Sequence, residues 1–415
     1  MNRRPHSYLL LLALGLLLSL GACGGGGGGG SSAASASVPT PAPPASTPAP
    51  VQTLSAMAAL GERAFNDRTL SGSGRMTCAT CHDPDFAHGS PNALAVQIGG
   101  QFESEFGQRS APSIRYLERQ PAFDPVGIIG GLTADGRADS LAAQSHLVLF
   151  NPLEFDNTSV ERLAQRVRAS VIAADFAKVF GTDGDAATTV AQLEQALQAF
   201  QLEDKRLHPY DSKFDWVQAG KETFTAPEQR GQQVFRDPAR GACIGCHLDT
   251  SSDGKPPLFT NFGYVATGAP RNAKIPANAD PAYFDLGLCG PLRKDLAQRA
   301  ELCGLFRTPG LRNVAQRQVF FHNGIFSSLP QVLDFYNTRD TSPERWYPTV
   351  AGKLQKFDDL PPAYRGNLST LPPFAGLRPG DKPPMSARDL LDLECFLMTL
   401  SDGHVIGTPA VASCR

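Results

Sequence analysis

The sequence predicts a mainly α-helical protein with long loops and two domains. Apolar residues recur at helical spacing, whereas the alternating pattern typical of strands is scarce. The 415 residues include 40 Gly and 34 Pro, a content typical of long connections between helices. Hydrophobic residues make up 41%, enough for packed cores, and the net charge of −2 offers no footprint for nucleic acid, so we expect no such partner.

The first 22 residues have the pattern of a bacterial export signal. Two arginines precede an apolar run that ends at Leu20 and is too short to span a bilayer. The small residues before Cys23 resemble the lipoprotein signal, in which that cysteine becomes the lipid-bearing first residue. An ordinary cleaved signal is the alternative. We therefore expect residues 1–22 to be a lipoprotein signal and the protein to reside in the periplasm. Gly24 after the cysteine favours anchoring in the outer membrane.

A tether is expected over residues 23–51. Seven consecutive glycines follow Cys23, and Ser, Ala and Pro dominate the rest, a composition typical of a flexible linker. No later stretch has 18 unbroken apolar residues, so we expect no membrane-spanning helix.

Two Cys-x-x-Cys-His motifs are the strongest chemical signal. Their residues are Cys78, Cys81 and His82 in the first, and Cys243, Cys246 and His247 in the second. Two thiols on one turn can each bond to a haem vinyl group, and the histidine that follows then lies beneath the iron as an axial ligand. A zinc site is the alternative, but an oxidising compartment argues against it because free thiol pairs oxidise there. The motifs predict two covalently bound haem c groups.

The motifs lie 165 residues apart, which predicts one cytochrome-c-like haem domain around each, over residues 52–210 and 211–415. In the first domain, a capping box at Thr158 is expected to open one helix of about 20 residues, with Val171 and Val179 on its apolar face. In the second, a helix over 226–235 is expected to lead into the haem motif.

Four further cysteines favour two local disulfides. Cys289 and Cys303 lie within one loop-rich segment, and Cys395 and Cys414 lie near the C-terminus, so these are the simplest pairs. Each would stabilise the fold by about 3 kcal/mol on the loop-entropy model. A cross-pairing such as Cys303 with Cys395 stays open.

Strings after both haem motifs resemble the bacterial dihaem cytochrome c peroxidase and MauG superfamily over residues 54–400. They are Ala111-Pro112-Ser113, Asp135-Gly136-Arg137, Asn151-Pro152-Leu153-Glu154, Phe306-Arg307-Thr308-Pro309-Gly310-Leu311-Arg312-Asn313, Phe321-His322-Asn323-Gly324 and Leu333-Asp334-Phe335-Tyr336-Asn337. The resemblance implies that hydrogen peroxide reacts at the N-terminal haem and that electrons pass through the C-terminal haem.

The resemblance also assigns residues around the first haem. It places the family's distal Gln and Glu at Gln144 and Glu154. A carboxylate there can take a proton from one oxygen of hydrogen peroxide and return it to the other. Many members carry a histidine that caps this haem, where this chain has Gly100, so the haem is expected to be open. His88 and His146 are the alternative caps.

For the second haem, the resemblance places the distal ligand 14 residues after His322, at Tyr336. Family peroxidases have Met there and MauG-like members Tyr, and an anionic tyrosinate lowers the reduction potential that a thioether raises. Met385 and Met398 are the alternative ligands. His322 and Arg312 are expected to surround this haem without ligating it.

Two departures concern the space between the haems. The family's bridging Trp is replaced by Ala134, which leaves Phe123 as a substitute aromatic residue. The Asn that helps to hold an inter-haem calcium ion is Ser110 here, so one calcium ion is a further candidate cofactor, with carbonyls near Thr308 as ligands.

Together these features predict a dihaem c-type peroxidase with a MauG-like tyrosine ligand. The electron donor would be a small periplasmic cytochrome c or cupredoxin. One alternative is a MauG-like enzyme that oxidatively modifies a partner protein, and another is a dihaem electron carrier without catalysis.

Overall fold

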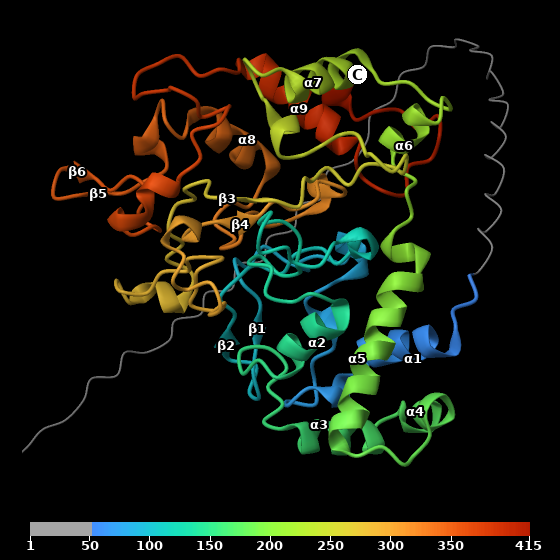
Figure 1. Cartoon of the computed structure of the whole chain (residues 1–415). Helices are drawn as coiled ribbons and strands as arrows, with labels where there is room; N and C mark the ends of the chain where they lie inside the picture. The colour runs from blue at the N-terminus through green and yellow to red at the C-terminus, as the bar shows by residue number, and fades with distance from the viewer. Residues whose placement is uncertain (1–51) are drawn as a thin grey trace, which may run out of the picture. The chain divides into compact units, whose positions relative to one another are not determined.

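The computed structural model describes residues 52–415, so the predicted signal, tether and lipid attachment at Cys23 lie outside the described residues. The helices are α1 (Ala56–Phe65), α2 (Leu141–Leu149), α3 (Val160–Ala169), α4 (Ala173–Phe180), α5 (Ala186–Glu203), α6 (Lys213–Gln218), α7 (Ala226–Arg236), α8 (Leu329–Thr338) and α9 (Ala387–Met398) (Figure 1). Long loops and short 3₁₀ turns connect them.

Strands are few and short in this part of the chain. They form three antiparallel pairs: β1 (Ile98–Gly99) with β2 (Glu105–Phe106), β3 (Tyr264–Val265) with β4 (Phe306–Arg307), and β5 (Thr349–Val350) with β6 (Lys353–Leu354). Ile98 lies opposite Phe106 in the first pair, and Tyr264 lies opposite Arg307 in the second. The prediction of a mainly α-helical chain is confirmed.

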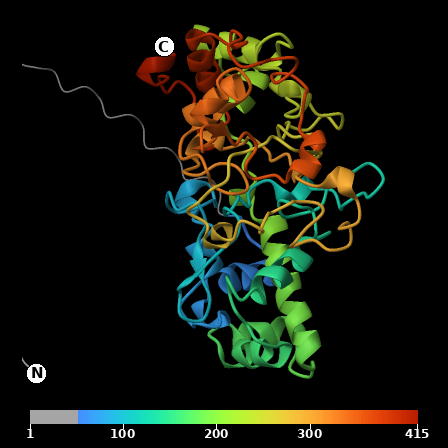
Figure 2. The same ribbon diagram turned by 90° about the vertical axis from the view of Figure 1, so that its left-hand side faces the viewer.

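The buried apolar residues form two large clusters. One lies within residues 54–207, which we call the N-terminal lobe, and the other within residues 213–415, which we call the C-terminal lobe. Each lobe is built on a pair of packed helices, α1 with α5 and α7 with α9, which lie side by side in Figures 1 and 2.

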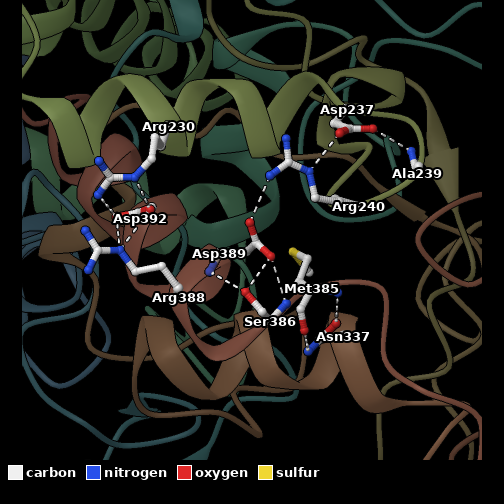
Figure 3. Close-up of polar contacts among 10 residues, drawn as sticks. All are labelled: Arg230, Asp237, Ala239, Arg240, Asn337, Met385, Ser386, Arg388, Asp389 and Asp392. Carbon is white, nitrogen blue, oxygen red and sulfur yellow. Dashed lines mark hydrogen bonds and ion pairs between the residues drawn. The ribbon is translucent and has the colours of Figure 1, made fainter.

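Both helix pairs cross at a glycine. A Cβ atom at Gly61 would lie 1.9 Å from the carbonyl oxygen of Ala196, and one at Gly231 would lie 1.9 Å from that of Asp392. No side chain fits in such a gap, so glycine permits the backbones to approach. Hydrogen bonds also connect α8 to the segment that leads into α9. The Asn337 side-chain amide donates to the Met385 carbonyl and accepts from the Met385 backbone N–H (Figure 3).

The helix predicted to begin at Thr158 is wrong in length. It is two helices, α3 and α4, and the cap is Ser159, whose hydroxyl accepts from the Arg162 amide. The break comes at Ser170, whose backbone is extended and whose hydroxyl donates to the Val167 carbonyl, a local bond that competes with helix continuation. Val171, expected on the apolar face, is 71% exposed.

Two disulfides are present, and they are the two local pairs. Cys289 is bonded to Cys303, and Cys395 is bonded to Cys414. The second bridge fastens residues near 414 to α9, and Thr225 donates a hydrogen bond to the Cys414 carbonyl (2.6 Å). Within residues 52–415, no helix is long and apolar enough to cross a membrane.

The two lobes are joined by a buried carboxylate. Asp402, in the C-terminal lobe, accepts hydrogen bonds from the Tyr116 hydroxyl and the Arg115 guanidinium of the N-terminal lobe. Asn313 donates to the same carboxylate. Contacts so distant in sequence make the position of one lobe depend on the other.

Candidate functional site

One cavity of about 610 Å³ is lined by residues of both lobes. All six residues of the Cys-x-x-Cys-His motifs face it, and most of its other lining residues are apolar. The helix pairs of the two lobes position these motifs, because each motif follows one member of a pair, α1 or α7, through a connecting segment. A single apolar chamber that bears two such motifs is the kind of space that two haems would fill.

Both motif histidines are held in the same way. The Nδ1 atom of His82 lies 3.0 Å from the Pro112 carbonyl oxygen and 3.2 Å from that of His88, and Nδ1 of His247 lies 2.9 Å from the Phe259 carbonyl oxygen. A ring that donates through Nδ1 keeps Nε2 unprotonated for a metal. Burial lowers the pKa of both histidines, which favours the same neutral form.

The four motif cysteines are unpaired in the structure, unlike the other four cysteines of residues 52–415. Burial raises the pKa of Cys78 to about 12, so this thiol is protonated at neutral pH. No group of three or more His, Cys, Asp or Glu residues converges in the described chain, as a zinc site would require. Paired thiols with a neutral histidine that face an apolar cavity fit thioether attachment of haem.

Glu154 and Gln144 both reach the cavity. Glu154 lies close enough to the Cys81 thiol to raise its pKa, which places the carboxyl group beside the first motif. Burial raises the pKa of Glu154 to about 7, against the opposing effect of the Arg137 guanidinium. Gln144 comes from α2. A carboxyl group with such a pKa can both accept and release a proton near neutral pH.

Tyr336 lines the cavity beside the second motif. It lies half-buried on α8, and its ring stacks on Phe374 (centroids 5.5 Å apart, 18° between planes). Desolvation raises its pKa, and the Cys246 and Cys243 thiols raise it further. Met385, one alternative ligand, also lines the cavity, whereas the other, Met398, does not.

The two alternative caps of the first site do not line the cavity. The carbonyl of His88 lies against Nδ1 of His82, so His88 is behind that ring, away from its metal-binding edge. His146 is an exposed residue of α2, and its Nδ1 pairs with Glu194 at 2.7 Å. This geometry therefore argues against both His88 and His146 as caps of the first haem.

Arg312 does not line the cavity either, although it was expected near the second haem. Its guanidinium pairs with Asp215 at 2.8 Å and lies over the rings of Tyr116 and Tyr210, at 4.9 and 4.7 Å. Arg312 therefore connects the C-terminal lobe to Tyr116 of the N-terminal lobe.

An aromatic pair that the sequence did not suggest lines the cavity. Phe306 and His322 stack with centroids 3.5 Å apart and 7° between planes, and the Arg109 guanidinium lies 5.6 Å from the Phe306 centroid. Ala134, where the resemblance places a Trp, accepts a hydrogen bond from the Arg307 amide (2.8 Å), next to this pair. The nearest hint in the sequence was that both rings belong to the recognised strings.

Phe123, proposed as the substitute aromatic, lies elsewhere. It packs edge-on against Tyr264, and the Arg293 guanidinium lies 3.8 Å from its centroid. It does not line the cavity.

The groups named for calcium are engaged by protein partners. Ser110 donates through its hydroxyl to the Phe321 carbonyl (2.7 Å), and the Thr308 carbonyl accepts from the Thr260 hydroxyl (2.7 Å). No cluster of acidic ligands accompanies them within residues 52–415.

Comparisons with known proteins agree with this geometry. Residues 55–223 match the family model described as di-haem cytochrome c peroxidase. The chain is 35% identical to the methylamine utilization protein MauG of Paracoccus denitrificans over 296 residues, which cover 68% of this chain and 74% of that protein. It is 27% identical to the cytochrome c551 peroxidase of Nitrosomonas europaea over 295 residues, covering 69% and 76%. Its fold matches the crystal structure of the diheme peroxidase BthA from Burkholderia thailandensis with a TM-score of 0.77 and 40% identity, covering 86% and 89%.

Proposed function

The chain belongs to the di-haem cytochrome c peroxidase family, and from that membership we propose that it reduces hydrogen peroxide at the N-terminal site with electrons that enter through the C-terminal site. It is an oxidoreductase that carries two c-type haems. The observation that carries the proposal is the half-buried Glu154 side chain, which faces the cavity beside the first motif, whereas Tyr336 faces it beside the second.

Each haem would be held by one motif in its own domain, the first through Cys78 and Cys81 and the second through Cys243 and Cys246. The bound haem supplies a redox-active iron that accepts peroxide and exchanges electrons. His82 would hold the iron of the first haem and His247 that of the second, and each ring is oriented by the carbonyl that accepts from its Nδ1.

Glu154 does the proton chemistry. Its carboxylate takes the proton from one oxygen of hydrogen peroxide and delivers it to the other oxygen, which leaves as water. Over the full cycle one hydrogen peroxide takes up two electrons and two protons and yields two waters. The Gln144 amide holds the peroxide by hydrogen bonding. The pKa of about 7 supports this role, because the group changes protonation readily at neutral pH.

We propose that Tyr336 would also hold the iron of the second haem. Its place on the cavity wall, its stacking on Phe374 and its nearness to Cys246 support this role. The stacked Phe306 and His322 rings, which line the cavity near Ala134, are the proposed aromatic bridge between the two sites.

The test is spectroscopic. Oxidised protein should give one high-spin and one low-spin haem signal by low-temperature EPR, and one equivalent of peroxide or cyanide should shift the Soret band at once. Two low-spin haems that respond to neither would contradict the proposal and favour an electron carrier. In Tyr336→Met the low-spin signal should change, whereas Met385→Leu should leave it unaltered. The reverse result would make Met385 the ligand.

A second candidate function is oxidative modification of a partner protein, which the 35% identity to a MauG protein favours. Steady-state turnover separates the two functions. A peroxidase consumes peroxide continuously with a reduced cytochrome c or cupredoxin as donor, whereas a modifying enzyme consumes little unless its protein substrate is present.

We also propose that the protein is periplasmic and lipid-anchored at Cys23, preferably in the outer membrane. The lipoprotein-like pattern before that residue supports the proposal. Cys23→Ser should move the protein from the membrane fraction to the soluble periplasmic fraction, and unchanged membrane association would contradict the anchor.

A further inference from the structure

Arg317 is a half-buried arginine with no anionic partner. No carboxylate in residues 52–415 pairs with its guanidinium. The guanidinium carbon lies 5.9 Å from the centroid of the Phe320 ring. Burial without a counter-charge lowers the pKa of Arg317 to about 10.

The other arginines that line the cavity have oxygen partners. Arg109 pairs with Asp135 and Asp285, and Arg137 pairs with Asp135. Arg307 donates to the Thr133 carbonyl and the Gln120 amide oxygen. These contacts satisfy each guanidinium within the protein, so the lack of any such oxygen at Arg317 is specific to that position.

Arg317 also faces the cavity, and it does so from the C-terminal lobe. Its chain neighbours Val314 and Phe320 belong to the buried cluster of that lobe and line the same cavity. Tyr336 and the second haem motif line the same chamber. The unpaired charge therefore belongs with the second site.

Removing an unpaired guanidinium from water is unfavourable, and an anion hydrogen-bonded to it offsets that cost. No carboxylate of the described chain pairs with this charge, so the anion has to arrive with whatever fills the cavity. A c-type haem carries two propionate carboxylates, and arginine binds carboxylates through paired N–H donors. We propose that Arg317 binds a propionate of the C-terminal haem, an inference that rests on the proposed attachment of that haem through Cys243 and Cys246.

Such a contact would also tune the second site. A fixed positive charge beside the haem stabilises the reduced form and raises its reduction potential, whereas a tyrosinate ligand lowers it. The same charge keeps the propionate ionised. Arg317 and Tyr336 would therefore act in opposite directions on one potential.

The experiment compares Arg317→Gln and Arg317→Lys with wild type and with Arg162→Gln, which removes an exposed arginine of the N-terminal lobe. Haem content by pyridine haemochromogen comes first. A wild type with a single haem would overturn the proposed attachment itself, a result distinct from those below.

With two haems bound, spectroelectrochemical titration should give a lower midpoint potential for the C-terminal haem in Arg317→Gln, with the N-terminal haem little changed. That potential should also become pH-dependent over the range in which a buried carboxylate titrates, roughly pH 5 to 8. Arg317→Lys should keep most of the wild-type behaviour. An unchanged potential and an unchanged pH dependence in Arg317→Gln would overturn the proposal.

If Arg317→Gln does not fold or load haem, resonance Raman spectra of wild type and Arg317→Lys decide the matter. The propionate bending band of the C-terminal haem should differ between them, because a lysine makes a single point contact where arginine makes a paired one. Identical bands would overturn the contact.

Discussion

The two lobes share one construction and differ in the side chains that they contribute to the cavity. Both have a helix pair that crosses at a glycine, Gly61 or Gly231, and both hold the motif histidine through a backbone carbonyl. The N-terminal lobe contributes the polar Glu154 and Gln144 to the cavity lining. The C-terminal lobe contributes the aromatic Tyr336. One construction can thus serve two roles, because the role depends on a few side chains around the shared frame.

Replacing Glu154 is expected to have the largest effect, since it would remove the feature that distinguishes the N-terminal site. Glu154→Gln keeps the shape of the side chain but cannot carry the proton, so kcat/KM for peroxide should fall by about 100- to 10,000-fold. Steady-state kinetics with a reduced cytochrome donor measures this. The control Glu344→Gln changes an exposed glutamate and should retain activity. Full activity in Glu154→Gln would remove the proposed difference between the lobes.

The shared frame can be tested at its two crossings. Gly61→Ala and Gly231→Ala each place a methyl group against a backbone carbonyl, so the helices have to separate, and each change should lower the free energy of unfolding by about 2 to 3 kcal/mol. Chemical denaturation measures the loss. Gly220→Ala alters a glycine with no atom near its absent Cβ, and it reports the separate cost of a positive φ. Unequal losses of unfolding free energy at the two crossings would show that the two helix pairs differ in stability, although their backbones approach equally closely.

The pH dependence of activity tests the role of Glu154, the polar residue that distinguishes the N-terminal lobe in this comparison. Because burial raises the pKa of Glu154 to about 7, the group is mostly protonated below pH 7, and only the carboxylate can accept the peroxide proton. Activity should therefore fall as the pH is lowered through 7, by about tenfold per pH unit. A kcat/KM profile of wild type tests this. A profile that is flat from pH 5 to 8, or that is unchanged in Glu154→Gln, would assign the proton transfer to another group.

The smallest effect is expected at an ion pair that accompanies one crossing. Arg230 on α7 binds Asp392 on α9 through two N–H donors, and Figure 3 shows Arg388 on the same carboxylate. Since Arg230 is partly exposed and Arg388 remains, Arg230→Ala should lower the free energy of unfolding only slightly, and by less than Gly231→Ala does. Thermal unfolding of the two variants checks this order. A loss comparable to that of Gly231→Ala would mean that charge, not close packing, holds this pair of helices.

The sequence predicted best what depends on neighbours along the chain. The haem motifs and the two disulfides involve short spacings, and the helix over 226–235 needed only its own periodicity. The apolar spacing did not reveal where hydrogen bonds of a side chain compete with those of the helix backbone. The helix break at Ser170 depends on a single hydroxyl contact, although the apolar spacing continues through it.

The interior of the cavity could be predicted only in part. Glu154 and Tyr336 were found because family strings contain them, whereas Phe123 was chosen for its position in sequence and lies elsewhere. The stacked rings of Phe306 and His322 meet only in three dimensions. In the same way, the unpaired state of Arg317 becomes evident only when the partners of the other arginines are known, since Arg109 finds Asp285 176 residues away.

The buried Asp402 carboxylate bears on the order in which the protein is assembled. Tyr116 and its acceptor are 286 residues apart, so this contact between the lobes cannot form until almost all of the described chain has been synthesised. Until then the cavity around the first motif is incomplete, because residues of the C-terminal lobe form the rest of its lining. The first haem can therefore be loaded from the side that the later lobe will cover. We expect thioether formation at Cys78 and Cys81 to precede docking of the lobes.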